Sequence, residues 1–440
     1  FYYSLQTCLQ SLFHKILSMI FNLWSRYKDI GLFTFSSLTK AFGQLVSGLL
    51  IIRFIEPKDL GIWHSLNLVT TYALFMQGGV LNGLSRELPF FLGEGKEEKA
   101  QDLASTTNAY TNICSILSII IGVIALCVYW NESYKIRLAI GAVSITTAFT
   151  FYNDYLITTF RSKNSFNKMA YVYLTEASLM ILSLPLLYFF QYEGLILRAL
   201  IVSGIALFLL HKVRPLPIKI KFKKDDFFLL LKTGIPIFIL AYIVSSTSTF
   251  DRIFLLKEGG TELVGYYALA MIVFSTFEII PGSLSHYIYP RMSYEFGKEK
   301  NPFHLWKIGM KVSGIIFLIM LPLAVIAWAS LPFFVNNFFP KYAAGITSAQ
   351  IILFGSIFSS LTIVVNSLWS MKKWKYIIIY QVTISALQIL GPFLGMFIFS
   401  SPLVGVSIGK VFSLICKGIM SIIISYLALI HPSSMTTHKQ

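Results

Sequence analysis

The chain has 440 residues, of which 55% are hydrophobic and 13% charged, and its net charge is +16. Soluble domains usually carry about 25% charged residues, so this composition excludes an ordinary soluble protein. A basic excess would indicate nucleic-acid binding in a soluble chain, but here the basic residues lie mostly between apolar runs, where they set topology. We therefore expect a multi-pass membrane protein that binds no nucleic acid.

The first 30 residues differ in pattern from the rest of the chain. Residues 5–24 are apolar on one side and are interrupted by His14 and Lys15, which favours an interfacial amphipathic helix over a membrane-spanning one. No small-residue cleavage site follows this stretch, so no cleavable signal peptide is expected. Residues 1–30 are therefore predicted to form an interfacial N-terminal segment.

Apolar runs of about 20 residues, the length that crosses a hydrocarbon core of about 30 Å, recur along the remaining chain. They predict twelve transmembrane helices, at 31–55, 61–83, 104–129, 137–160, 169–190, 195–211, 228–257, 263–288, 307–333, 345–370, 376–400 and 403–430. The predicted fold class is therefore an all-α polytopic membrane protein. Lys and Arg are frequent in the N-terminal segment, the even-numbered loops and the tail, and scarce in the odd-numbered loops, which predicts that both termini are cytoplasmic.

The longest predicted inner loop, residues 212–227, is basic, contains two prolines and falls near the middle of the chain. These features are typical of a linker between two six-helix halves. The predicted domains are thus the N-terminal segment, an N-lobe at 31–211, the linker, a C-lobe at 228–430 and a cytoplasmic tail at 431–440. The predicted outer loops are too short to hold a catalytic domain outside the membrane.

An internal repeat supports this division. A shift of 204 residues places Gly61 on Gly265 and Gly78 on Gly282, with a helix end, a short outer loop and a glycine-containing helix in the same order. Two halves in the same orientation are related by an axis along the membrane normal, an arrangement known in transporters. The repeat therefore predicts a central cavity between two lobes.

Several predicted helices contain residues that bend helices. These are Gly78-Gly79 in the second, Pro236 in the seventh, Pro281-Gly282 in the eighth and Pro392 in the eleventh. Glycine and proline are common in membrane helices in any case, because neighbouring groups satisfy the backbone that they free. Each position is nevertheless a candidate bend.

Charged residues within the predicted helices are candidates for a substrate pathway, because a charge at the bilayer centre costs at least about 2.5–3.5 kcal/mol. With one basic residue of an inner loop, the candidates are Lys40, Arg86, Asp154, Glu176, Asp251, Arg252, Glu278, Lys410 and Lys417. The alternative interpretation is structural: Asp154 or Glu176 pairs with a lysine and joins two helices. Taken together, the charges indicate a cationic inner vestibule that suits an anionic substrate such as a phosphate or pyrophosphate group.

The stretch 40–108 resembles a known family. The residues that carry the resemblance are Arg53, Pro57, Gly61-Ile62-Trp63, Gly83-Leu84-Ser85-Arg86-Glu87-Leu88-Pro89 and Gly93, with Asp251-Arg252-Ile253 and Val264-Gly265-Tyr266-Tyr267-Ala268 in the second half. They are similar to the signature of Wzx-type polysaccharide repeat-unit flippases of the multidrug/oligosaccharidyl-lipid/polysaccharide (MOP, MATE-like) superfamily. Together with the two halves, the resemblance covers most of the chain.

The resemblance implies a V-shaped pair of six-helix lobes that works by alternating access in the bacterial inner membrane. The implied cargo is an undecaprenyl-pyrophosphate-linked oligosaccharide of O-antigen, capsule or a similar polymer, moved from the cytoplasmic to the periplasmic leaflet. Lys40 takes the place of an arginine that lines the cavity of the related lipid II flippases. A polysaccharide polymerase and a chain-length regulator are candidate partners.

Two other functions compete with this interpretation. A MATE-like exporter of drugs or metabolites would need an acidic cation site, for which Asp154 and Glu176 are candidates, but the basic inner half argues against a cationic cargo. A membrane glycosyltransferase or polymerase would need catalytic groups on larger outer loops, and GxxxxGK[ST] and HExxH motifs are absent. We expect a transporter and no enzyme. No cofactor or metal is predicted, and protons and sodium both stay open as coupling ions.

Overall fold

A computed structural model describes residues 32–33, 35–217, 220–299 and 301–430. The predicted interfacial segment 1–30 and the predicted tail 431–440 lie outside these residues. Within the described ranges the chain is almost entirely helical and contains no strand. Eight of its segments are long and apolar enough to cross a membrane.

The helices of the first half follow the predicted spans closely. They are an initial helix Phe35–Phe54, α2 Pro57–Ala73, η1 Leu74–Gln77, α3 Val80–Gly93, α4 Glu97–Val128, α5 Tyr134–Ser162, α6 Phe166–Leu182 and α7 Pro185–Lys212. Two boundaries differ from the prediction. The span predicted at 61–83 continues through α3 to Gly93. Within the span predicted at 169–190, α6 ends at Leu182 and Pro185 begins α7, whereas the kink of α7 at Gln191 (φ 45°) lies where the predicted spans 169–190 and 195–211 are separated.

The second half continues with α8 Lys224–Thr247, α9 Phe250–Glu299, α10 Pro302–Phe338, η2 Pro340–Gly345, α11 Ile346–Ile357, η3 Phe358–Val365, α12 Asn366–Ser370, α13 Trp374–Ile398 and α14 Pro402–Ile430. α9 reverses direction at Gly259–Gly260, where the backbone leaves helical geometry. The hydrogen bond from Tyr267 to Asp251, 16 residues apart, forms because of this reversal. The span predicted at 228–257 is therefore divided between α8 and the first turns of α9.

The candidate bends have different outcomes. Gly78 (φ 56°) and Gly79 (φ 88°) adopt the left-handed backbone that favours glycine, and they separate η1 from α3 as predicted. Pro236 and Pro392 lie inside α8 and α13, and both helices continue through them. α9 likewise passes through Pro281–Gly282 without leaving helical geometry.

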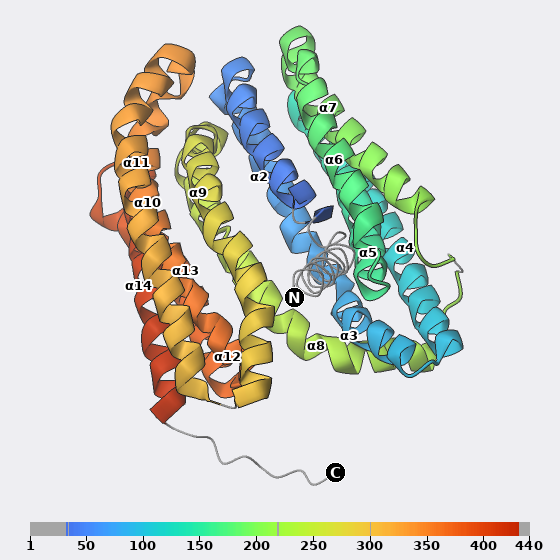
Figure 1. The fold of residues 1–440 in the computed structure, drawn as a ribbon. Helices are drawn as coiled ribbons and strands as arrows, with labels where there is room; N and C mark the ends of the chain where they lie inside the picture. The colour runs from blue at the N-terminus through green and yellow to red at the C-terminus, as the bar shows by residue number, and fades with distance from the viewer. Residues whose placement is uncertain (1–31, 34, 218–219, 300, 431–440) are drawn as a thin grey trace, which may run out of the picture.

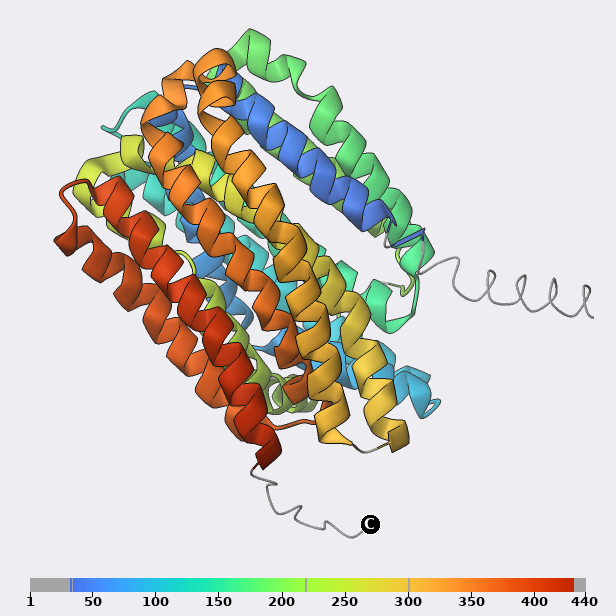
Figure 2. The same ribbon diagram turned by 60° about the vertical axis from the view of Figure 1, so that its left-hand side comes forward.

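The helices form two lobes (Figure 1). The blue-to-green helices of the first half lie on one side and the yellow-to-red helices α9 to α14 on the other, while α8 crosses between them at the lower end of the view. Figure 2 shows the second lobe from its own side, with α10 to α14 running side by side. A mostly apolar cluster contains residues of both lobes, including Trp63, Val264 and Tyr342.

At the predicted outer end, α2 and α9 touch through two glycines that the repeat aligns. A methyl group at Gly61 would overlap the carbonyl oxygen of Thr261, and one at Gly265 would overlap that of Pro57. The 204-residue shift that relates the two glycines also relates Pro57 to Thr261, so the contact is reciprocal. Small residues allow this close approach of helix backbones in membranes. The lobes are therefore joined at the predicted outer end.

At the predicted inner end, the first half of α8 packs on the first lobe. Gly79 approaches the backbone of Gly234 so closely that a methyl group at either position would overlap the other. Lys99 of α4 pairs with the buried Asp226, and Lys223 pairs with Asp102. The pKa of Lys223 is raised because its ammonium donates a hydrogen bond to Asp102. The described end of the predicted linker is thus bound to α4.

Candidate substrate cavity

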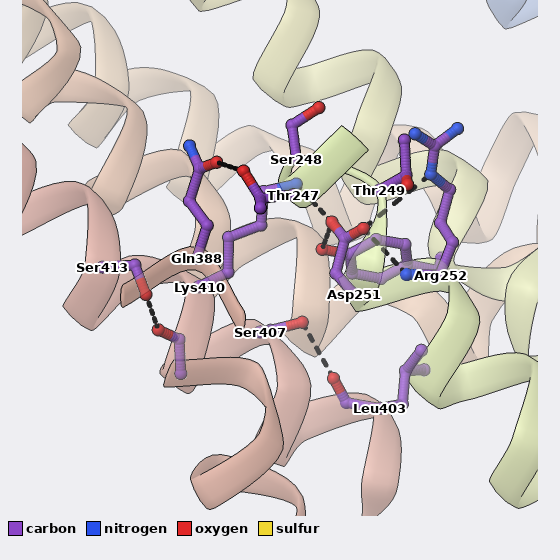
Figure 3. A network of polar contacts seen from close by, with 12 residues as sticks. Thr247, Ser248, Thr249, Asp251, Arg252, Gln388, Leu403, Ser407, Lys410 and Ser413 are labelled. Atoms are coloured by element: carbon purple, nitrogen blue, oxygen red, sulfur yellow. Dashed lines mark hydrogen bonds and ion pairs between the residues drawn. The ribbon is translucent and has the colours of Figure 1, made fainter. Parts of the chain in front are cut away.

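A cavity of about 350 Å³ lies in the second lobe, between α8, α9, α13 and α14. Five of the nine candidate residues line it, namely Asp251, Arg252, Glu278, Lys410 and Lys417. They come from parts of the chain that are far apart in sequence, as Figure 3 shows for Asp251 of α9, which faces Lys410 of α14. The fold therefore brings together most of the charged candidate residues of the predicted membrane helices.

Close packing of α13 and α14 holds one wall of this cavity. Gly391 and Gly395 of α13 lie against Gly409 and Gly405 of α14, and a methyl group at any of the four would overlap a carbonyl oxygen of the facing helix. Two glycines four residues apart on each helix are the small-residue pattern that lets membrane helices approach closely. Lys410 follows Gly409 directly and is positioned by this contact.

Asp251 is the most enclosed charge in the cavity, with 3% of its side chain exposed. The ammonium of Lys410 pairs with it, the Tyr267 hydroxyl donates to it at 2.9 Å, and the Arg252 backbone N–H donates to it at 2.8 Å (Figure 3). Its position in the first turn of α9 adds the favourable field of a helix N-terminus. The Asp251 carboxylate is therefore fully compensated by the protein.

Other groups in the cavity are not compensated. Lys417 has no ion-pair partner among the described residues, and the buried Oε1 atom of Glu278 has no hydrogen-bond partner there. Arg252, Lys410 and Lys417 together outnumber the two carboxylates of the cavity. Such a set attracts an anion through its surplus positive charge, and the Glu278 carboxylate can accept a hydrogen bond from a hydroxyl group.

The remaining candidates lie elsewhere. Lys40 pairs with Glu176 at 2.7 Å and lies over the ring of Tyr173, so these two residues join the initial helix to α6, as the structural interpretation expects. Asp154 accepts a hydrogen bond from the Gln77 amide at 3.2 Å. Arg86 is two-thirds exposed, 3.5 Å from Glu87. None of the four lines the second-lobe cavity.

Sequence reasoning missed Arg198. It is not among the candidate residues, because the span predicted at 195–211 puts it near a helix end; in the structure it lies in α7, beyond the kink at Gln191, with 8% of the residue exposed. The signal that could have found it is the apolar run on both sides of the arginine. No cluster of three or more His, Cys, Asp or Glu side chains in the described part of the chain could hold a metal ion.

The arrangement of these helices is a MATE-like fold. An inward-facing multidrug resistance MATE family transporter superimposes with a TM-score of 0.71 at 14% identity, covering 89% of this chain and 94% of that one. The lipid II flippase MurJ in an inward closed conformation gives 0.69 at 14% identity, covering 91% of this chain and 87% of that one. No protein-family profile and no curated protein matches the sequence.

An outward-facing MATE family transporter superimposes with a TM-score of 0.62 at 14% identity, covering 91% of this chain and 94% of that one. The prediction of an all-α chain of about twelve membrane helices in two lobes is confirmed by this likeness.

Proposed function

We propose that this chain is a flippase that moves an undecaprenyl-pyrophosphate-linked oligosaccharide from the cytoplasmic to the periplasmic leaflet by alternating access. The observation that carries the proposal is the second-lobe cavity, where cationic side chains outnumber carboxylates and Lys417 has no ion-pair partner among the described residues. A buried surplus of positive charge is costly unless a ligand supplies the missing anion.

Two kinds of polar group in the cavity match the two ends of such a headgroup. Arg252 and Lys417 suit the phosphate oxygens, because charge-assisted hydrogen bonds are stronger than neutral ones. Glu278, Gln388 and Ser248 line the same cavity and suit sugar hydroxyls, which both donate and accept. A polyprenyl tail would stay in the bilayer while the headgroup enters between the lobes.

Transport then requires the outer contact to open. In the proposed cycle the headgroup binds while Gly61 and Gly265 hold the outer end together, and separation of α2 from α9 releases it on the other side. The positive-inside pattern supports cytoplasmic termini and an inner-membrane location. A polysaccharide polymerase and a chain-length regulator are proposed partners that would use the product, which is an O-antigen, capsule or similar repeat unit.

A second candidate, export of a cationic drug or metabolite, is favoured by one observation. Asp154 is an acid within α5 that no described lysine or arginine pairs with. The two functions predict opposite charge preferences, so one experiment separates them.

The test is a proteoliposome assay of the purified full chain, with a fluorescent polyprenyl-pyrophosphate disaccharide as the cargo. Lys417→Ala should lower the initial flipping rate about tenfold, which corresponds to about 1.4 kcal/mol. Lys311→Ala is the matched control, because Lys311 lies in α10, is exposed and does not line the cavity; it should flip at the parental rate. An unchanged rate in Lys417→Ala, or uptake of a cationic dye in place of the glycolipid, would refute the proposal.

A further inference from the structure

A second cavity, of about 270 Å³, lies in the first lobe between the initial helix, α6 and α7. Its polar lining comes from Gln44, Ser47, Glu176, Arg198 and Ser203. Glu176 is the only carboxylate among these described residues, and Lys40 already pairs with it at 2.7 Å. The Arg198 guanidinium therefore faces this cavity without a carboxylate partner in the described part of the chain.

The hydrogen bonds of Arg198 leave part of its guanidinium unused. Its Nη2 atom donates to the Ser47 hydroxyl and, at 2.9 Å, to the carbonyl oxygen of Met180 in the last turn of α6. Its Nε atom is buried and has no hydrogen-bond partner among the described residues. A buried donor without a partner is costly, and for a charged group in a membrane the cost is larger.

A purely structural role for Arg198 would be to donate a hydrogen bond to a carbonyl oxygen at the end of α6. Arg137 shows what that role requires. Arg137 donates to the carbonyl oxygen of Trp130 at 3.0 Å, but this hydrogen bond lies at an exposed position. Arg198 makes the same kind of contact with 8% of the residue exposed. A neutral donor would serve the Met180 carbonyl at lower cost, so the buried charge needs another explanation.

The cavity also lies beside the boundary between the lobes. Gly48 follows Gln44 by one turn of the initial helix, and a methyl group there would lie 3.5 Å from Ile272 of α9 in the other lobe. Both Gln44 and Gly48 line the cavity. A group that moves between the lobes would therefore pass close to Arg198.

We propose that this first-lobe cavity is an oxyanion site for a lipid phosphate, with Arg198 as its main ligand and the Gln44 amide as a second donor. A guanidinium presents several N–H groups in a plane that matches phosphate oxygens. The inference rests on the proposed function for the source of the phosphate, which is the pyrophosphate of the transported glycolipid. Each lobe would then hold the anionic group through its own cation.

The experiment measures thermal unfolding of the full chain in phosphatidylcholine nanodiscs by tryptophan fluorescence, with and without farnesyl pyrophosphate as the probe. Lys417→Ala serves as the background, so that the remaining shift in Tm reports the first lobe. Arg198→Gln in that background should abolish the shift, and Arg198→Lys should lower it by about half. Arg137→Gln, the matched control, should keep the whole shift.

Gln44→Leu is a second test in case the Arg198 variants do not fold, because no described hydrogen bond of the fold depends on Gln44. Since Gln44 lines the cavity, this variant should also lower the shift in Tm that farnesyl pyrophosphate causes. If both Arg198→Lys and Gln44→Leu keep the whole shift, the site is rejected. Nanodiscs that contain phosphatidylglycerol distinguish a glycolipid phosphate from a bulk phospholipid headgroup. If the Arg198-dependent shift in Tm is lost in these nanodiscs, the site binds a bulk phospholipid headgroup, which contradicts a glycolipid source. If the shift persists, a glycolipid source is supported.

Failure of this inference and failure of the proposed function give different results. Normal binding in Arg198→Gln together with slow flipping in Lys417→Ala would overturn only the first-lobe site. An Arg198-dependent shift in a chain that flips no glycolipid would keep the site and overturn the proposed function.

Discussion

Each lobe contains a lysine–carboxylate pair that joins two of its membrane helices, and these two pairs are built alike. Lys40 and Glu176 join the initial helix to α6, and Lys410 and Asp251 join α14 to α9. Both lysines also lie over an aromatic ring, at 4.4 Å from the centre of the Tyr173 ring for Lys40 and 4.9 Å from that of the Phe274 ring for Lys410. The two pairs therefore use the same chemistry to hold helices together.

The lobes differ in what remains beside each pair. In the first lobe Arg198, which has no carboxylate partner among the described residues, lines a smaller cavity with one carboxylate. In the second lobe Lys417 and the unpartnered oxygen of Glu278 share one cavity with the pair. The comparison teaches that a paired charge fixes helices, whereas an uncompensated charge facing a cavity is the one available to a ligand. Breaking a pair should thus affect stability first, and removing an uncompensated charge should affect transport first.

The largest effect is expected at Asp251. Asp251→Ala leaves Lys410 buried without its partner, and loss of one member of a buried pair destabilises by about 3–5 kcal/mol. The measurement is thermal unfolding of the purified protein, where Asp251→Ala should show the lowest Tm of the variants discussed.

The double variant Asp251→Ala/Lys410→Met tests the cause of that loss. It removes both charges, so it should regain much of the lost stability. Equal Tm values for the single and double variants would show that Asp251 acts through Tyr267 and the turn into α9, and that the pair is not the stabilising unit.

A smaller effect is expected at Lys40. Its side chain is 23% exposed and that of Glu176 15%, so Lys40→Ala should destabilise by about 1.5 kcal/mol, the usual range for a hydrogen bond to a charged group. If the pyrophosphate also contacts Lys40, a complementation assay for surface polysaccharide should fail for Lys40→Ala and partly survive for Lys40→Arg.

The charge swap Lys40→Glu/Glu176→Lys separates the two roles. The swap retains an ion pair between the initial helix and α6, so stability should return. Complementation that returns with stability would assign Lys40 to helix packing alone, and full activity in Lys40→Ala would remove it from the substrate pathway.

The sequence predicted the large-scale arrangement because the signals for it are local. Apolar runs mark the helices, and the repeat aligned Gly61 with Gly265, the two residues that meet between α2 and α9. Hydropathy also marked Asp251 and Lys410 as unusual. It could not pair them, because their contact spans 159 positions and depends on the reversal at Gly259–Gly260.

Two features needed tertiary structure. The kink at Gln191 lies inside α7, and beyond it Gly194 packs on the backbone of Leu186, a contact that hydropathy does not show. Arg198 follows this kink, and hydropathy likewise does not show that its side chain is buried. The attachment of α8 to the first lobe was likewise not predicted, because the contacts of Asp226 with Lys99 and of Gly234 with Gly79 join segments distant in sequence.

The smallest effect is expected for a third ion pair, which crosses between the lobes at the predicted outer end. Lys341 pairs with Glu56, and both side chains are about half exposed, so the pair contributes at most about 1 kcal/mol and weakens in high salt. Glu56→Gln should leave Tm nearly unchanged.

Glu56→Gln nevertheless removes a contact that exists only while the outer end is closed, beside the hydrogen bond from Tyr342 to the Ile55 carbonyl at 3.1 Å. The ratio of closed to open molecules should then fall about twofold, which corresponds to about 0.4 kcal/mol. The measurement is thiol labelling of a cysteine introduced at Leu60, which is buried in this structure. Labelling should become faster in Glu56→Gln. Unchanged labelling in Glu56→Gln would show that Gly61 and Gly265 hold the outer end closed by packing, without a contribution from the Lys341–Glu56 pair.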